Sequence, residues 1–267
     1  MEGDADRSED VRKAARGVDA IVYGLNLPYK HWQDSARPLL EITLRIAEED
    51  NLLIVFPANV YVFNPNHGPE FTEHNVFEPI SEKGKVRAQM ERRLQRASQN
   101  GARVLIIRAG DFIGRNASGS WLAQLLIQRR GGYTLLDPTT EGHRHSWAYL
   151  GDLAGVTAEL MGNSPEHDAY EVFHFRGQQL TMADIKAAIE SQTKQSVKIK
   201  PFPWWLVRIA ASFVRAPKEL LEMRYLWEQE VNLNQQKLEK VLQRSPEQTP
   251  LADALVQSGL LDQGSLD

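Results

Sequence analysis

The sequence contains no cysteine and no long apolar run. The lack of cysteine excludes disulfides, thiolate metal ligands and a cysteine nucleophile. No apolar stretch approaches the ~20 residues that a membrane-spanning helix needs. The first residues, MEGDADR, are acidic and have no apolar core, which is not typical of a signal peptide. We therefore expect a cytoplasmic protein without a membrane span.

Neither sign of charge dominates the sequence. Its 31 Lys and Arg and 35 Asp and Glu residues give a net charge of −4 at pH 7. This balance argues against nucleic acid as the main partner. A chain of 267 residues, 42% of them hydrophobic, can bury the core of one large domain or of a main domain with a smaller lobe.

Helical and strand patterns alternate in the first 108 residues, which is typical of βαβ crossovers and a parallel sheet. We predict an α/β fold with a Rossmann-type parallel sheet and a small mixed C-terminal lobe. The expected strands are residues 18–24, 52–56 and 103–108, and the expected helices are residues 8–16, 35–49 and 84–97.

The later part of the sequence predicts a mixture of short elements. Thr181 is the expected N-cap of one helix, with Asp184 at the third helical position. The expected strands are residues 132–136, 143–149, 170–175 and 197–202. The expected helices occupy residues 120–129, 181–190, 204–214, 217–227, 234–242 and 250–256. One more helix is expected to begin at residue 151.

One stretch, residues 52–87, combines a buried strand, a polar loop and a charged helix. Open α/β sheets bind their ligands in the crevice outside the carboxyl ends of the strands. We therefore expect the functional site at the loop that follows residue 56.

Five short motifs occur in a fixed order along the chain. Gly3-Asp4-Ala5 precedes a predicted helix and strand, and Val60-Tyr61 follows a predicted strand. The other three are PISEKGK at 79–85, IRAGDFIG at 107–114 and WAYLGDLA at 147–154. Their order resembles the extended short-chain dehydrogenase/reductase family, the NAD-dependent epimerases and dehydratases, and in particular its atypical branch. The resemblance implies an NAD(P)-binding Rossmann-like domain over residues 1–157. It also implies a smaller substrate lobe over residues 158–267, interleaved with the first.

The family's Gly-x-x-Gly-x-x-Gly fingerprint is absent. In the family this loop places backbone N–H groups and a helix N-terminus against the pyrophosphate. By the resemblance, the chain begins near the end of the family's third strand, so we expect an N-terminally truncated sheet. The chain is then either part of a longer protein or a degenerate member, and the strand near residues 20–23 has an unpaired edge.

The family's catalytic residues are also replaced. Aligned on the family motifs, Lys83 takes the place of the catalytic tyrosine, Arg87 that of the lysine and Pro57 that of the serine. Arg87 could hold a ribose hydroxyl or a phosphate. Lys83 could transfer protons only with a pKa lowered from ~10.4 towards neutrality. The alternative is that Lys83 and Arg87 lie at a solvated helix start and have no acid/base role. Tyr61 is a candidate substitute acid, or a packing residue.

The resemblance implies an NAD or NADP site. Asp4 would contact the adenine, with a turn at a strand end as the alternative. Gly24 would allow close approach of the cofactor, with an ordinary turn glycine as the alternative. The candidate cofactor-binding residues are Asp4, Ala5, Gly24, Leu25, Asn26, Pro57, Arg87 and Ala109.

Two further features have alternative interpretations. His143 and His145 could be metal ligands on one strand face, but no third ligand is identifiable, and surface histidines are the alternative, so we predict no metal site. Residues 203–209, PWWLVRI, could form a membrane-surface or partner helix, or could pack within the C-terminal lobe.

The resemblance implies an NAD(P)-dependent oxidoreductase or an epimerase/dehydratase-like protein that acts on a small carbonyl or sugar-like substrate. A homodimer is the candidate assembly. The alternatives are a non-catalytic nucleotide-sensing or interaction protein on the same fold, or an inactive fragment.

Overall fold

The computed structural model describes residues 2–115, 119–139, 142–163 and 168–261. They form α/β structure, as predicted, in two compact units. The first unit comprises Met1–Asn64, Glu73–Arg108 and Leu160–Phe173, and the second comprises Pro65–Thr72, Ala109–Glu159 and His174–Asp267. Within the described ranges, no helix combines the length and apolar character needed to cross a bilayer.

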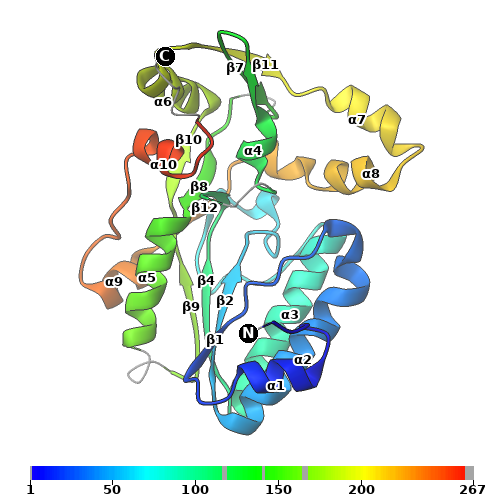
Figure 1. The fold of residues 1–267 in the computed structure, drawn as a ribbon, viewed down its shortest axis with the longest axis vertical. Helices are drawn as coiled ribbons and strands as arrows, with labels where there is room; N and C mark the ends of the chain where they lie inside the picture. The colour runs from blue at the N-terminus through cyan, green and yellow to red at the C-terminus, as the bar shows by residue number, and fades with distance from the viewer. Residues whose placement is uncertain (1, 116–118, 140–141, 164–167, 262–267) are drawn as a thin grey trace. The chain divides into compact units, whose positions relative to one another are not determined.

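The first unit is built on a sheet with the strand order β1-β2-β4-β9 (Figure 1). The pairs β1–β2 and β2–β4 are parallel, which confirms the predicted parallel sheet. In the described sheet β1 has one strand neighbour, β2, so it forms the edge expected near residues 20–23. The strands are β1 (Ala20–Val22), β2 (Leu53–Ala58), β4 (Arg103–Arg108) and β9 (Tyr170–His174).

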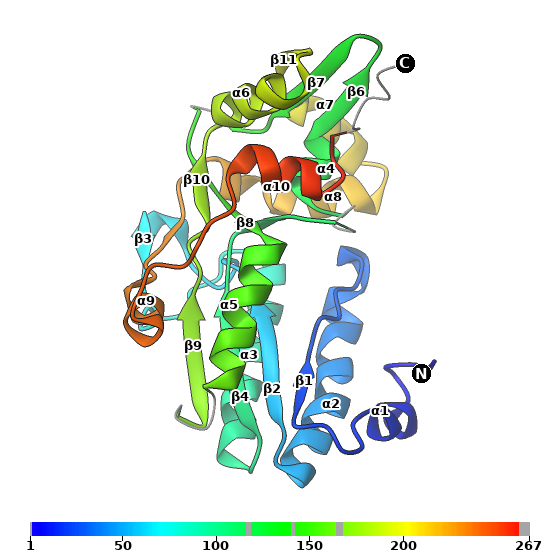
Figure 2. The same ribbon diagram turned by 60° about the vertical axis from the view of Figure 1, so that its left-hand side comes forward.

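The helices of the first unit are α1 (Ser8–Ala14), α2 (Arg37–Asp50) and α3 (Glu82–Gln99). Figures 1 and 2 show α2 and α3 side by side along one face of the sheet. Their apolar stripes bury Leu44 and Leu94 against Ile54 of β2, because residues at helical spacing share a face. The side chain of Ser81 caps α3 by accepting a hydrogen bond from Gly84 N at 3.0 Å.

The second unit contains smaller sheets with the orders β10-β8-β5, β11-β7-β6 and β12-β3. Its strands are β3 (Glu70–Phe71), β5 (Asp111–Ile113), β6 (Leu126–Arg129), β7 (Gly132–Asp137), β8 (His145–Tyr149), β10 (Gln178–Leu180), β11 (Ser196–Pro201) and β12 (Asn232–Leu233). Its helices are α4 (Trp121–Leu125), α5 (Leu150–Gly162), α6 (Met182–Thr193), α7 (Trp204–Ala211), α8 (Arg215–Glu222), α9 (Gln236–Leu242) and α10 (Leu251–Gln257). The last residues of α5, from Leu160 on, belong to the first unit.

The predicted helix at residues 120–129 is wrong in its second half. Helix α4 ends at Leu125, and the following residues form β6, which pairs antiparallel with β7. Arg129 lies opposite Gly132, so the turn between the strands is only two residues long. Gly131, with a φ of 81°, supplies the left-handed conformation that such a turn requires. Residues 126–129 therefore form one strand of a β-hairpin, although their apolar spacing is typical of a helix.

The predicted start of α6 is confirmed. Thr181 Oγ1 accepts from Asp184 N at 3.1 Å, and the Asp184 carboxylate accepts from Thr181 N at 2.9 Å. The Asp184 carboxylate also accepts from Thr181 Oγ1 at 2.8 Å, and the two hydrogen bonds that it accepts from Thr181 lower the pKa of Asp184. They make the reciprocal capping box that the sequence predicts.

We expect Asp184→Asn to lose stability at neutral pH but not in acid. A depressed pKa contributes stability above the unfolded-state pKa, and this contribution is lost as the pH falls through the folded-state pKa. The cost should be about 0.3–1 kcal/mol, because Asp184 is a partly exposed charge at a helix N-terminus. Thermal unfolding at pH 6 and pH 3 measures this, and an equal difference at both would contradict it.

A buried ion pair joins α3 to the end of β4. Arg108 donates to both Glu91 carboxylate oxygens, at 3.0 and 2.6 Å, and both side chains are fully buried. Arg108 also donates to the backbone oxygen of Asn59 at 2.5 Å. The guanidinium lies 5.0 Å from the Phe63 ring centroid, so the loop after β2 contacts this cation through two of its residues.

We expect Glu91→Gln to destabilise the protein by about 3–5 kcal/mol, because it leaves the Arg108 charge buried without a counter-charge. Urea unfolding measures the loss. Glu82→Gln is the matched control on the same helix: Glu82 pairs with Lys85 at 2.6 Å on the surface, where a salt bridge is worth about 1 kcal/mol or less. Similar losses in the two variants would refute the account.

Candidate functional site

The candidate site of the first unit lies at the carboxyl ends of β1 and β2. The chain after β1 forms a loop, a 3₁₀ turn at Tyr29–His31 and a π-helical turn at Trp32–Ala36. The chain after β2 forms a loop that contains Asn59 and Tyr61, and α3 begins behind it. The carboxyl ends of parallel strands are the usual ligand-binding edge of an open α/β sheet.

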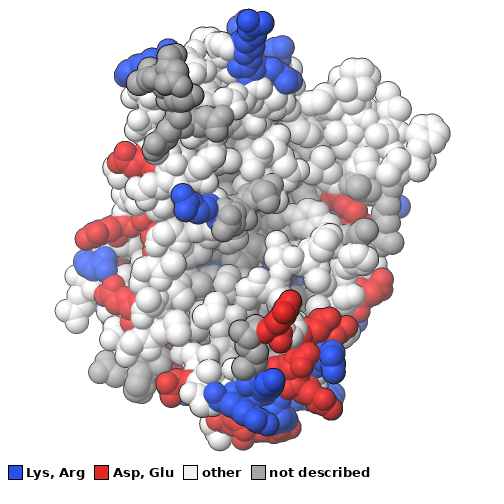
Figure 3. All heavy atoms as spheres, viewed as in Figure 1, with Lys and Arg blue, Asp and Glu red and all other residues white. Residues whose placement is uncertain are grey.

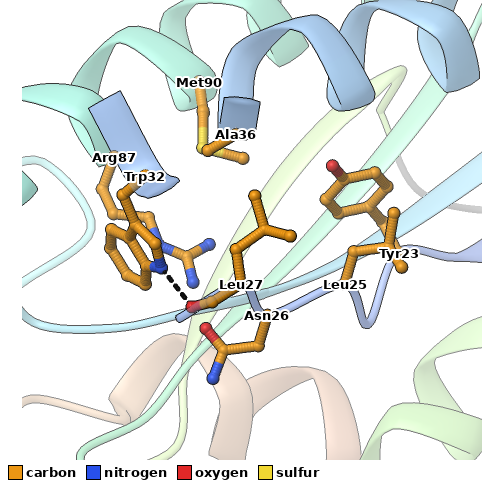
Figure 4. A pocket seen from close by; sticks show the side chains of 8 residues that line it. All are labelled: Tyr23, Leu25, Asn26, Leu27, Trp32, Ala36, Arg87 and Met90. Atoms are coloured by element: carbon orange, nitrogen blue, oxygen red, sulfur yellow. Dashed lines mark hydrogen bonds between the residues drawn. The ribbon is translucent and has the colours of Figure 1, made fainter. Parts of the chain in front are cut away.

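A small pocket opens at this edge (Figure 4). The space open to the centre of a water molecule is about 10 Å³, which is room for about one water. The Trp32 indole N–H donates to the backbone oxygen of Leu27 at 2.7 Å and so holds the loop after β1 in place. The residues that line the pocket are Tyr23, Leu25, Asn26, Leu27, Trp32, Ala36, Arg87 and Met90.

Arg87 is the single cation that lines this pocket. Its guanidinium lies beside the Trp32 ring (Figure 4), 4.6 Å from the ring centroid. It also lies 5.4 Å from the centroid of the Phe56 ring. Among the described residues no carboxylate pairs with it, and its buried Nε has no acceptor. Burial lowers its pKa, although the fields of Tyr61 and Glu91 oppose the shift. The group stays charged at neutral pH and is available to an anion or a hydroxyl oxygen.

A second group, Tyr61, lies beside the pocket. Its hydroxyl oxygen is 3.1 Å from that of Tyr29, and its backbone N–H donates to Asn59 Oδ1 at 3.1 Å. The Lys83 ammonium lies 5.0 Å from the Tyr29 ring centroid. Lys83 is only 3% exposed, so the alternative of a solvated helix start does not hold for it. Tyr29 thus links Tyr61 to Lys83.

This arrangement is suited to proton transfer. Two hydrogen-bonded phenols beside buried cations can donate a proton to a bound group or accept one from it. Tyr23 is not suited to this role, because burial raises the pKa of its hydroxyl to about 12. Tyr29 and Tyr61 are therefore the candidate proton-transfer groups of this site.

The structure brings some of the sequence-predicted residues together. Leu25, Asn26 and Arg87 line the pocket, and Tyr61 and Lys83 connect to it through Tyr29 and Trp32. Tyr29 and Trp32 themselves were not predicted as site residues. Two aromatic residues soon after the first strand were the available signal.

The other candidate residues lie outside the pocket lining. Asp4 Oδ1 accepts from Asp6 N at 3.3 Å, in a tight turn that includes Ala5. A side chain at Gly24 would meet no atom within 4 Å, so packing alone does not demand glycine there. Pro57 lies within β2, opposite Ile107 of β4. Ala109 is buried and belongs to the second unit.

The second unit contains a separate polar pair. His145 Nε2 lies 2.6 Å from Asp111 Oδ2, and the imidazole stacks on the Trp227 ring at 4.0 Å between centroids. His145 is thus engaged by a carboxylate within the protein. In the described part of the chain, no group of three or more His, Cys, Asp or Glu residues could hold a metal ion.

We expect Arg87→Met to leave the stability unchanged or to raise it by up to about 1 kcal/mol, since it removes a half-buried charge that has no carboxylate partner among the described residues. Arg108→Met is the contrasting variant. It leaves the Glu91 carboxylate buried without a counter-charge and should lower the free energy of unfolding by about 3–5 kcal/mol. Urea unfolding of both variants measures the difference. A loss above about 2 kcal/mol in Arg87→Met would show that Arg87 has a structural role instead.

The chain was compared with known proteins at the levels of sequence and structure. No protein-family model and no curated protein sequence matches it. Solved structures do match over nearly its whole length. A UDP-glucose 4-epimerase from Bifidobacterium longum, in complex with NAD⁺ and UDP, is 14% identical with a TM-score of 0.71; the match covers 97% of this chain and 81% of that one.

Other sugar-nucleotide enzymes give similar matches. A UDP-galactose 4-epimerase is 15% identical with a TM-score of 0.71, over 96% of this chain and 81% of that one. A dTDP-glucose 4,6-dehydratase from Streptomyces venezuelae, solved with NAD bound, is 17% identical with a TM-score of 0.68, over 96% of this chain and 76% of that one. The chain therefore has the Rossmann-like fold of the NAD-dependent epimerases and dehydratases, as its motifs predict.

Proposed function

We propose that the first unit binds NAD or NADP, and that the chain is an NAD(P)-dependent oxidoreductase or an epimerase/dehydratase-like protein with a small carbonyl or sugar-like substrate. The observation that carries the proposal is Arg87, a cation without a carboxylate partner in the pocket at the carboxyl end of β1. The fold it shares with NAD-containing epimerases and dehydratases supports the choice of ligand.

The donor chemistry of Arg87 suits the ribose or phosphate oxygens of such a cofactor, although the pocket that Arg87 lines has room for only about one water. A guanidinium is a planar fork of donors that suits phosphate and ribose oxygens, and the buried Arg87 Nε still lacks an acceptor. Leu25 and Asn26 supply the loop against which the cofactor would lie. The sequence has no Gly-x-x-Gly-x-x-Gly loop, so the proposal assigns no residue of this chain to the pyrophosphate.

A bound nicotinamide supplies hydride acceptance or donation. In the proposal, Arg87 binds and orients the cofactor, with its own position fixed by stacking on Trp32. Tyr61 and Tyr29 hold or transfer a proton at their hydroxyl oxygens, which lie 3.1 Å apart.

A second candidate function is nucleotide binding without catalysis. It is favoured by Lys83, which stands where the resemblance places the catalytic tyrosine. The two functions differ in one observable. Reduction of a carbonyl substrate by bound NADH supports the first, whereas binding without turnover across nucleotide sugars supports the second.

Fluorescence titration of the purified chain with NADH and NADPH tests the binding step. We expect saturable binding, and we expect Arg87→Ala to weaken it about tenfold or more, because it removes a charged hydrogen-bond donor worth about 1.5–3 kcal/mol. Arg96→Ala, an exposed arginine on the same helix, is the matched control and should bind as the unchanged chain does. Absence of saturable binding would overturn the proposal.

A further inference from the structure

Several arginines of the first unit have acids beside them. Figure 3 shows Lys, Arg, Asp and Glu side chains gathered together over α1 and α2. Arg12 of α1 pairs with Glu49 of α2, and Arg93 of α3 binds Glu41 and Glu48, each at 2.7 Å. The charges of Arg12 and Arg93 are therefore compensated within the chain.

Arg87 has no such compensation. Among the described residues no carboxylate pairs with its guanidinium, and its buried Nε has no hydrogen-bond acceptor. Glu91, one turn further along α3, is already bound through both carboxylate oxygens to Arg108. Trp32 and Phe56 contact the Arg87 guanidinium through their rings, which cannot replace an acceptor in the plane of the N–H groups. The chain thus leaves both a positive charge and a buried donor unmatched.

The pocket that Arg87 lines limits what can meet this charge. The space open to the centre of a water molecule is about 10 Å³, which is room for about one water. In its present shape the pocket therefore excludes a phosphate or carboxylate group but admits a single atomic ion, because a chloride ion is only slightly larger than a water molecule. Among the described residues that line it there is no Asp or Glu, and the side chains beside Arg87 include the Asn26 amide and the apolar Leu27 and Met90.

We propose that this pocket binds one small monovalent anion of the halide class, held by the Arg87 guanidinium. Figure 4 shows the guanidinium turned towards Leu27 and Asn26, which lie on the pocket side. A halide ion accepts hydrogen bonds from the unmatched donors and also compensates the charge, whereas a water molecule does only the first. A weakly hydrated, planar guanidinium is the protein cation best suited to such an ion.

A halide on Arg87 occupies the group that the proposed function assigns to the cofactor, so chloride and NADH compete. This competition rests on the proposed function, whereas the ion site itself does not. We expect the apparent Kd of NADH to be about two- to tenfold higher in roughly 100 mM chloride than in gluconate at equal ionic strength. This range follows by mass action for an ion site that is half-saturated at about 10–100 mM.

Chloride titration of the full chain tests the ion site, with sodium gluconate keeping the ionic strength constant so that screening does not change. The readout is the line width of the chlorine NMR signal, which broadens when the ion exchanges onto a protein. We expect saturable broadening, half-complete at roughly 10–100 mM chloride, because a ligand of one atom binds weakly. Arg87→Met should remove it. Arg96→Met, which changes an exposed arginine of the same helix, is the matched control and should leave it unchanged.

Ion size separates the pocket from the protein surface. Bromide should displace the bound chloride, whereas sulfate is too large for the pocket and should not. The backbone amide spectrum of each variant checks that it is folded. No saturable broadening in the unchanged chain, equal broadening in Arg87→Met, or displacement by sulfate as effective as by bromide would overturn the ion site.

The two proposals can fail separately. Chloride binding at Arg87 in a chain that does not bind NADH would support the ion site and overturn the proposed function. NADH binding that chloride does not weaken, in a chain that binds chloride at Arg87, would overturn the competition.

Discussion

The site of the first unit depends on one buried ion pair. Glu91 and Arg108 are fully enclosed and doubly hydrogen-bonded, so neither charge can be lost without stranding the other. Arg108 also binds the backbone oxygen of Asn59, and the side chain of Asn59 binds the backbone N–H of Tyr61. The pair therefore fixes α3, the end of β4 and the loop after β2 in one arrangement.

Two arginines that contact helix α3 differ in their surroundings. Arg87 lies one helical turn before Glu91 on α3, yet it contacts aromatic rings rather than a carboxylate. An unmatched, partly desolvated cation costs stability, and such costs are typical of binding and catalytic sites. The neighbouring matched pair supplies the rigidity that lets this cation persist. Arg108 is thus paired with a carboxylate, whereas Arg87 contacts aromatic rings and is the candidate ligand-binding charge.

The sequence could predict the parallel sheet because buried strands and amphipathic helices carry distinct periodicities in the first 108 residues. Through the family resemblance it could also assign Leu25, Asn26 and Arg87 to one site, and these three residues do line one pocket. It could not reveal Tyr29 and Trp32, whose roles depend on a π-helical turn and on tertiary contacts. The burial of Lys83 was equally hidden, because a lysine after a helix N-cap is usually solvated.

The central claim is that a dinucleotide binds at the carboxyl end of β1. The most direct measurement is the backbone amide spectrum of the isotope-labelled chain during addition of NADH. The account predicts saturable shifts concentrated at residues 23–27, around Trp32 and in the first turns of α3, where the pocket lies. Shifts confined to the second unit, or no shifts at saturating NADH, would contradict it.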